Sequence, residues 1–369
     1  MLPPIFQSLE KRHYNKYLHL QLYAVCGIIN AVVFITLGTT KYKETDVMNS
    51  QLSQEQLKVL SLTKSVIGEV KKVIIGKDEI IIKVLLSILA GGHVLIEDIP
   101  GVGKTTLAVA LSKALSLEYK RLQFTPDVLP TDVTGFTILN KSTGKFEYKQ
   151  GAALTNLFLA DEINRTSSKT QSALLEIMEE GKVTVDGVTH KAPDPYIVIA
   201  TQNPIGSIGT QMLPESQMDR FIVRLTMGYP SLENEISVLK AKQNLVPVDN
   251  VRAVVSAQDI IAARKEVDSV YVSDQIFRYI AMLSDATRNN EYIKLGLSPR
   301  GTIAVLRMTK ATALLRGRDY VIPDDVLYCL DDVVLHRIIL NSKAKINGLT
   351  GSQILRSITQ SIQVPRISK

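Results

Sequence analysis

The feature that most constrains this sequence is the glycine-containing stretch at residues 98–105. It lies between His93–Glu97, an apolar run typical of a buried strand, and Thr105–Ser116, a run with helical spacing. A loop that joins a strand to a helix N-terminus can wrap a phosphate with backbone N–H groups, and the helix adds partial positive charge. Lys104 would reach the β- and γ-phosphates, and the Thr105 hydroxyl would bind Mg²⁺. The predicted nucleotide contacts in this loop are Pro100, Gly101, Val102, Gly103, Lys104, Thr105 and Thr106.

The loop departs from the P-loop pattern G-x-x-x-x-G-K-[ST] at its first position, where the chain has Asp98. The first glycine mainly shapes the entrance to the turn, so the loop is expected to tolerate the change. A carboxylate beside phosphates is nevertheless unfavourable. The alternative is a turn rich in glycine and proline that contains an incidental lysine.

Length and composition indicate a globular protein of two or more domains. The chain has 369 residues, 45% hydrophobic and 21% charged, a net charge of +7 and no Trp. Its Lys and Arg residues are scattered, and aromatic residues are sparse, which argues against a surface that stacks nucleic-acid bases. Cys26 and Cys329 show neither disulfide nor metal spacing, which favours a reducing compartment such as the cytoplasm.

The first 47 residues differ in composition from the rest of the chain. Within them, Leu18–Leu37 is largely apolar and uncharged, and about 20 such residues can span a membrane. Three explanations compete: a signal peptide, which lacks a cleavage site; a membrane anchor, which the flanking charges do not orient; and translation that starts at Met48. Residues 1–47 are therefore treated as a separate extension, through which alone membrane association is expected.

From Met48 the pattern predicts an α/β domain over residues 48–229 and an all-helical domain over residues 230–369. Apolar strands that alternate with helices indicate a parallel sheet covered on both faces. Hairpins are predicted over Gly135–Gly151 and over Lys182–Lys191, the second with an Asp-Gly turn. The five predicted strands of the sheet are His93–Glu97, Tyr119–Phe124, Leu157–Glu162, Tyr196–Thr201 and Phe221–Leu225.

Three further side chains are predicted to act on the bound phosphates. Asp161 and Glu162 end an apolar strand, where carboxylates reach the ligand-binding edge of a sheet. Asp161 would hold Mg²⁺ through water, and Glu162 would orient and deprotonate the attacking water. Asn203 follows the next strand and could hold the same water, although an Asn-Pro turn is the favoured explanation of this residue taken alone. Arg220 and Arg300 are ordinary arginines unless the fold brings them to a γ-phosphate.

The ordered motifs resemble those of AAA+ ATPases, and more closely those of the MoxR family. The resemblance covers about residues 58–365 and excludes the N-terminal extension. The motifs that carry it are GGHVLIE at 91–97, QFTPDVLPTDVTG at 123–135, ADEINR at 160–165, ATQNP at 200–204, LPESQMDRF at 213–221 and LSPR at 297–300.

The resemblance implies roles that the residues alone do not establish. It makes Asn203 the sensor-1 residue and Arg300 the sensor-2 residue, which contacts the γ-phosphate from the lid. It makes Arg220 an arginine finger offered to the ATP of a neighbouring subunit. Ile75 and Gly76 would belong to the segment that packs on adenine. The resemblance thus implies an AAA+ core with a parallel five-stranded sheet, followed by an all-helical lid, with ATP and Mg²⁺ as cofactors.

The family resemblance also implies partners. Its members form rings, often hexameric, and remodel or activate client proteins, commonly ones that carry a von Willebrand factor A domain. No nucleic-acid partner is expected. Two alternatives from other classes remain: a DNA-remodelling or helicase-related AAA+ protein, and a nucleotide-binding scaffold that does not hydrolyse ATP. Lys141, Lys145 and Lys182 on the hairpins favour the first only weakly, and Asp98 is the only support for the second.

Overall fold

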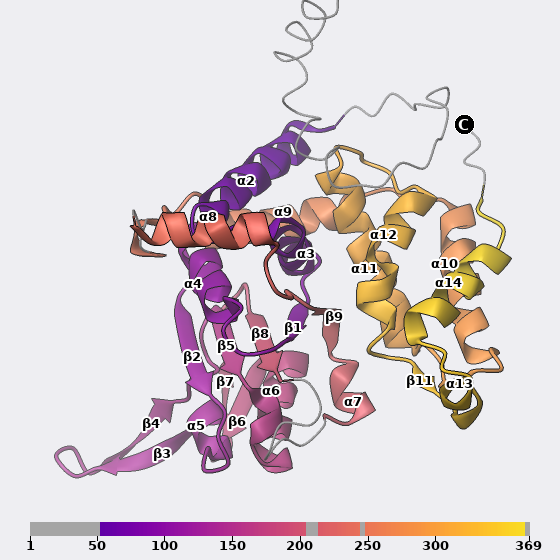
Figure 1. Cartoon of the computed structure of the whole chain (residues 1–369). Helices are drawn as coiled ribbons and strands as arrows, with labels where there is room; N and C mark the ends of the chain where they lie inside the picture. The colour runs from indigo at the N-terminus through magenta and orange to yellow at the C-terminus, as the bar shows by residue number, and fades with distance from the viewer. Residues whose placement is uncertain (1–51, 204–212, 244–247, 366–369) are drawn as a thin grey trace, which may run out of the picture. The chain divides into compact units, whose positions relative to one another are not determined.

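The computed structural model of the chain describes residues 52–203, 213–243 and 248–365 (Figure 1). The predicted extension at residues 1–47, with its apolar segment 18–37, lies outside the described residues. Across the part of the chain that is described, no helix is long and apolar enough to cross a membrane. The predicted domain boundary at 229/230 falls just before helix α8.

The core is a five-stranded parallel sheet with the strand order β2-β5-β8-β1-β9. The prediction of a five-stranded parallel sheet is confirmed, with strand ends within two residues of those expected. The strands are β1 (His93–Glu97), β2 (Tyr119–Gln123), β5 (Leu157–Asp161), β8 (Ile197–Gln202) and β9 (Phe221–Leu225).

Both faces of the sheet are apolar because alternate residues of its central strands enter different clusters. Leu159 of β5 belongs to the cluster formed with the first three helices, whereas Phe158 belongs to the cluster formed with α6. This double burial explains why the strands read as continuous apolar runs instead of alternating ones. The helices of the core are α2 (Gln54–Lys71), α3 (Asp78–Leu89), α4 (Lys104–Ala114), α5 (Pro130–Thr134), α6 (Ser168–Glu180) and α7 (Glu215–Met218).

A buried histidine ties α6 to the sheet. Val198 N–H donates to His93 Nδ1 over 3.1 Å, so the ring proton lies on Nε2, which donates to the Met178 carbonyl over 3.0 Å. Burial lowers the pKa of His93 to about 4. The neutral ring is therefore part of the packing between β1, β8 and α6.

The two predicted hairpins are present, and they contact each other. One consists of β3 (Gly135–Asn140) and β4 (Lys145–Gln150), and the other of β6 (Lys182–Val185) and β7 (Val188–Lys191). Asp186 and Gly187 have φ values of 49° and 81°, as a two-residue hairpin turn requires. Tyr148 stacks on His190, with ring centroids 3.7 Å apart, so each hairpin supports the other.

The C-terminal part is helical, with one departure from the all-helical prediction. A short antiparallel pair is formed by Ile293–Leu295 (β10) and Ile339–Leu340 (β11). Ile293 lies opposite Leu340 and is buried with the helical core, which stabilises the pair. The helices are α8 (Leu232–Gln243), α9 (Ala257–Ser269), α10 (Asp274–Arg288), α11 (Pro299–Leu315), α12 (Pro323–Val334), α13 (Ser342–Ile346) and α14 (Gly351–Ser361). Single 3₁₀ turns occur at Ile163–Arg165 and Val248–Asn250.

Candidate nucleotide site

The glycine-containing loop joins the end of β1 to the start of α4, as the sequence predicts. Gly101 and Gly103 have φ values of 84° and 97°, in the left-handed region that a side chain disfavours. Lys104 is the first residue of α4, and Thr105 and Thr106 follow in its first turn. The loop and this turn thus bring together all seven predicted phosphate contacts, from Pro100 to Thr106, at a helix N-terminus, where anions bind.

Asp98 turns its carboxylate towards backbone groups. Its Oδ1 accepts from Ile99 N–H over 2.8 Å, and its Oδ2 accepts from Gly228 N–H over 2.6 Å. Its carbonyl oxygen accepts from Lys104 Nζ over 2.6 Å. Burial lowers the pKa of Lys104, and the nearby carboxylates of Asp98, Asp161 and Glu162 oppose this shift. The acid that departs from the P-loop pattern therefore has a structural partner 130 residues away.

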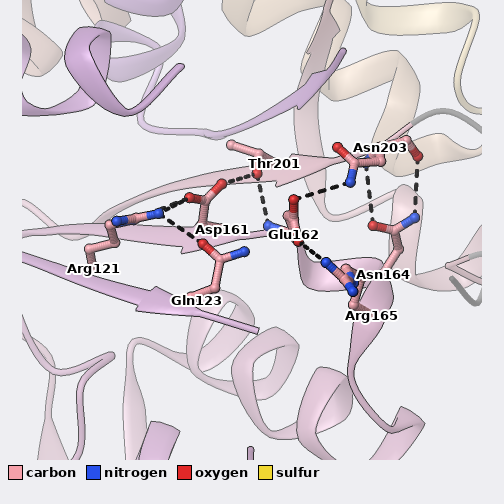
Figure 2. A network of polar contacts seen from close by, with 8 residues as sticks. All are labelled: Arg121, Gln123, Asp161, Glu162, Asn164, Arg165, Thr201 and Asn203. Atoms are coloured by element: carbon pink, nitrogen blue, oxygen red, sulfur yellow. Dashed lines mark hydrogen bonds and ion pairs between the residues drawn. The ribbon is translucent and has the colours of Figure 1, made fainter. Parts of the chain in front are cut away.

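Asp161 ends β5 in a network of polar contacts (Figure 2). Thr201 Oγ1 donates to its Oδ1 over 2.6 Å. Arg121 Nε and Nη2 donate to its Oδ2 over 3.1 and 2.7 Å, and the same Nη2 donates to Gln123 Oε1 over 2.8 Å. Three hydrogen bonds leave lone pairs on the carboxylate, so Asp161 can still accept from a metal-bound water.

Oxygen donors make this edge of the sheet suitable for Mg²⁺. The Asp161 carboxylate and the Thr105 hydroxyl are the ligand types that Mg²⁺ prefers. Among the described residues, no group of three or more His, Cys, Asp or Glu side chains is placed to hold a metal by itself. A metal bound by one or two protein groups together with phosphate oxygens and water fits this arrangement, because nucleotide-dependent Mg²⁺ sites are built in that way.

Glu162 has a strained backbone and a fixed carboxylate. Its φ and ψ are 57° and 47°, a left-handed conformation that costs a non-glycine residue about 1–3 kcal/mol. Thr201 Oγ1 accepts from its N–H over 2.9 Å. Its carboxylate accepts from Asn203 Nδ2 over 3.2 Å and from Arg165 Nη1 over 2.8 Å. The strain and these bonds aim the carboxylate away from the strand direction and towards Asn203 (Figure 2).

Asn203 reaches Glu162 because a second asparagine holds its backbone. Asn164 Nδ2 donates to Asn203 O over 3.2 Å, and Asn164 Oδ1 accepts from Asn203 N–H over 3.4 Å. Both asparagines are buried. The predicted proximity of Asn203 to the acidic pair is therefore present in the structure.

The sequence interpretation assigned no role to the residues that hold these groups. Thr201, Arg121, Asn164 and Arg165 all lie within or beside the motifs that carry the family resemblance, but their partners depend on strand order. Because β8 lies between β5 and β1, Thr201 is directly beside Asp161. Thr201 could be identified as a polar residue near the end of a buried strand that lies beside the strand with the acidic pair.

Arg220 and Arg300 lie at the opposite edge of the sheet, where the parallel strands begin. Arg220 precedes β9, and its Nε is 3.6 Å from Glu179 Oε2. Arg300 Nη2 is 2.6 Å from Glu179 Oε1. Both arginines line a cavity of about 450 Å³, together with Gly92 and His93 at the start of β1.

Arg300, which the family resemblance assigns to a γ-phosphate, lies away from the P-loop of its own chain. Lys104 lies beyond the far end of β1, and a five-residue strand spans about 16 Å. Ser298 Oγ and Arg337 Nε hold the start of α11 by bonding to Asp219 over 2.8 and 2.7 Å. Because Asp219 adjoins Arg220, these bonds place Arg300 beside the predicted arginine finger.

The segment predicted to pack on adenine lies against α8. A Cβ added to Gly76 would be 2.1 Å from Asn234 Nδ2, and its φ of 70° also favours glycine. Ile75 is half-buried beside it. Lys77 Nζ donates to the carbonyls of Met227, Gly228 and Tyr229, at 2.5, 2.9 and 2.9 Å.

Comparisons with known proteins identify the class of this fold. The model of the ATPase family associated with various cellular activities (AAA) matches residues 93–223, and the AAA lid domain matches residues 285–358. The chain is 38% identical to a presumed ATPase from Cytophaga hutchinsonii, whose crystal structure superposes with a TM-score of 0.80 over 85% of this chain and 98% of that one. The fold and the site therefore define an AAA+ ATPase with a nucleotide-binding core and a lid.

Named relatives specify the family. The chain is 48% identical to the uncharacterized protein YeaC of Bacillus subtilis, over 81% of this chain and 93% of that protein. It is 35% identical to the chaperone MoxR1 of Mycobacterium tuberculosis, over 82% of each chain. It is also 27% identical to the protein MoxR of Methylorubrum extorquens. The chain belongs to the MoxR family.

Proposed function

We propose that this AAA+ protein hydrolyses ATP to ADP and phosphate with Mg²⁺ bound at the P-loop. The observation that carries the proposal is the meeting of three elements at one edge of the sheet. The P-loop follows β1, Asp161 ends β5 and Glu162 comes directly after it, and Asn203 follows β8, which lies between those two strands. Thr105 and, through water, Asp161 would hold Mg²⁺, which neutralises phosphate charge when bound.

Glu162 is the group that we expect to remove a proton from the attacking water. The Asn203 amide and the Arg165 guanidinium each bond one of its carboxylate oxygens, so the carboxylate has one orientation before the nucleotide arrives. Positioning of this kind matters in phosphoryl transfer, where most of the catalysis is placement and charge stabilisation. Lys104 would then bind the β- and γ-phosphates from the first turn of α4.

We further propose that Arg220 and Arg300 act on the nucleotide of another copy of the chain. They lie at the edge opposite Lys104, about one strand length away, and both contact Glu179. An arginine supplied across an interface can raise the rate about 10³–10⁵-fold. This arrangement supports a homo-oligomer, and the family resemblance suggests a hexameric ring.

For the work driven by hydrolysis, we propose the remodelling or activation of a protein client in the cytoplasm. The β3–β4 hairpin exposes Phe136, Leu139 and Phe146, the last with 76% of its surface accessible. Exposed apolar side chains suit contact with a protein better than contact with nucleic-acid phosphates. A client with a von Willebrand factor A domain is the class that the family resemblance suggests.

The ATPase proposal is tested by two substitutions at the site and one control. Lys104→Ala should abolish nucleotide binding, measured by titration with a fluorescent ATP analogue. Glu162→Gln should retain binding but lose about 10²–10⁴-fold in kcat, the range expected for a general base. Glu180→Gln is the matched control, because Glu180 is an exposed carboxylate 3.6 Å from Lys182, and it should leave kcat within about twofold. Parent-like hydrolysis by the first two variants would refute the site, and so would unchanged activity when EDTA removes Mg²⁺.

Action across an interface is tested by mixing two inactive variants. Arg220→Ala keeps a complete P-loop but offers no arginine, whereas Lys104→Ala offers the arginine but binds no ATP. Each alone should be nearly inactive, and their mixture should recover activity where a complete pocket meets a complete arginine. Absence of recovery in a mixture whose subunits exchange, together with parent activity independent of protein concentration, would mean that Arg220 acts only within its own chain.

A further inference from the structure

The segment Met227–Tyr229, which leads from β9 into α8, is bonded to Asp98 of the nucleotide loop and to Lys77, which precedes α3. Lys77 contributes all three of its ammonium hydrogens, one to each carbonyl of the segment. Asp98 accepts from the central N–H, that of Gly228, over 2.6 Å. Three consecutive residues are therefore held by one cation and one anion.

The backbone of the segment is shaped for these contacts. Gly228 has a φ of 63°, and a Cβ added there would meet nothing within 4 Å. The requirement for glycine is therefore conformational, because a left-handed residue turns the chain. The turn lets three successive carbonyls converge on one ammonium group while the N–H between them faces the carboxylate.

Each of the two side chains also adjoins a part of the proposed ATP site. Lys77 follows Gly76, which lies against Asn234 of α8. Asp98 begins the P-loop, and its own carbonyl accepts from Lys104 Nζ over 2.6 Å. A nucleotide that draws Lys104 to its phosphates would remove this bond from Asp98, and it would do so next to the residue that holds Gly228.

We infer that Lys77 and Asp98 are positioning residues. Through them, the position of the start of α8 depends on whether nucleotide is bound at the P-loop. The inference rests on the proposed ATP site and assigns a role to the acid that replaces the first P-loop glycine. Asp98 is only 5% exposed. Each of its carboxylate oxygens accepts from a backbone N–H group, and these two bonds compensate the buried charge. Because Asp98 is held in this way, a shift of the P-loop would also shift Gly228, to which its carboxylate is bonded.

Hydrogen exchange of the full-length protein tests the inference at the Gly228 amide. Without nucleotide, Asp98→Ala should accelerate exchange in peptides that span residues 226–232 by about 10- to 100-fold, the equivalent of one hydrogen bond to a charged group. Lys77→Met should accelerate it in the same direction. Lys71→Met is the matched control, because Lys71 bonds only the carboxylate of Asp78, and it should leave exchange in these peptides unchanged.

The response to nucleotide distinguishes positioning from mere support of the fold. In a Glu162→Gln background, which prevents turnover, Mg-ATP should change the exchange of residues 226–232 at least about threefold. Asp98→Ala and Lys77→Met should lose this response while a fluorescent ATP analogue still binds. Asp98→Asn, which keeps one acceptor oxygen, should retain part of the response and serves if the alanine variant does not fold.

Two results would overturn the inference. One is an exchange rate at residues 226–232 that stays the same with and without bound nucleotide. The other is a full response in both variants. If the fluorescent analogue does not bind the parent protein at all, the proposed function itself fails and this inference fails with it, a result that the binding titration identifies separately.

Discussion

Thr201 holds both members of the acidic pair, so replacing it should disturb stability and catalysis together. Its hydroxyl donates to Asp161 Oδ1 over 2.6 Å and accepts from Glu162 N–H over 2.9 Å, and the residue is fully buried. Thr201→Val keeps the shape of the side chain and removes both bonds. A buried N–H without a partner costs about 1–3 kcal/mol, and the loss of a bond to a charged group costs about 1.5–3 kcal/mol.

These terms predict a loss of about 3–5 kcal/mol in the free energy of unfolding. For a domain of this size, the melting temperature should fall by about 6–20 °C in a thermal unfolding experiment. The released Glu162 backbone should also lower kcat by about tenfold or more with little change in KM, because the group acts on the transition state. ATP hydrolysis at saturating Mg-ATP, below the melting temperature of the variant, measures this second effect.

Thr201→Ser is the control because it removes the methyl group and keeps the hydroxyl, whereas Thr201→Val removes the hydroxyl. The loss of one buried methyl group costs about 1 kcal/mol. Its activity should therefore stay close to that of the parent. If the valine and serine variants melt within about 2 °C of each other, or if the serine variant loses as much kcat as the valine variant, the hydroxyl does not hold the acidic pair.

Three further predictions concern the packing around the site. His93 has a pKa of about 4 in the folded chain and an ordinary value of 6.5 when unfolded, so acidification from pH 7 to pH 5 favours the unfolded state by about 2 kcal/mol through this group. His93→Gln should reduce the pH dependence of urea unfolding by that amount, and an unchanged pH dependence would contradict the assignment. Asp325→Ala should cost about 3–5 kcal/mol in thermal stability, because it removes the buried carboxylate that pairs with the partly buried Arg316 and Arg318; a change below 1 kcal/mol would refute this. Gly92→Ala should destabilise by about 1–3 kcal/mol in the same assay, because its Cβ would be 2.4 Å from the Cβ of Ile222; unchanged melting would show that the site has room.

Local pattern was sufficient to predict the elements that build the site. The apolar runs that end at Glu97 and Asp161 are strands, and the loop before Lys104 joins a strand to a helix. Asp186-Gly187 turns the second hairpin. Each of these features is decided by residues close in sequence, where backbone preference and burial pattern act directly.

Contacts between distant segments were not predictable in the same way. The loop was expected to tolerate Asp98, but nothing in the local pattern indicated that its carboxylate bonds Gly228, 130 residues later. Arg300 was assigned to a γ-phosphate from the family motif, but its distance from the P-loop of its own chain depends on the bond of Ser298 to Asp219, which holds the start of α11 near the amino ends of the strands. Thr201 could be recognised only once β8 was known to lie beside β5. In each case the outcome depends on strand order and on the packing of helices, which the local pattern does not determine.

The P-loop and Arg220 lie at opposite ends of the strands, so each copy of the chain has two different functional ends. If the arginines act on another copy as proposed, a copy that receives them at the carboxyl ends of its strands would offer its own from the amino ends, so the interface would join two different surfaces. Such heterologous contacts propagate in one sense and end only if the row closes on itself. In an open linear assembly of any length, the nucleotide site of the copy at one end would receive no arginines. The arginines of the copy at the other end would have no nucleotide site to act on. Closure alone would give every copy a complete site, and the smallest incomplete assemblies would lose the largest share of their activity.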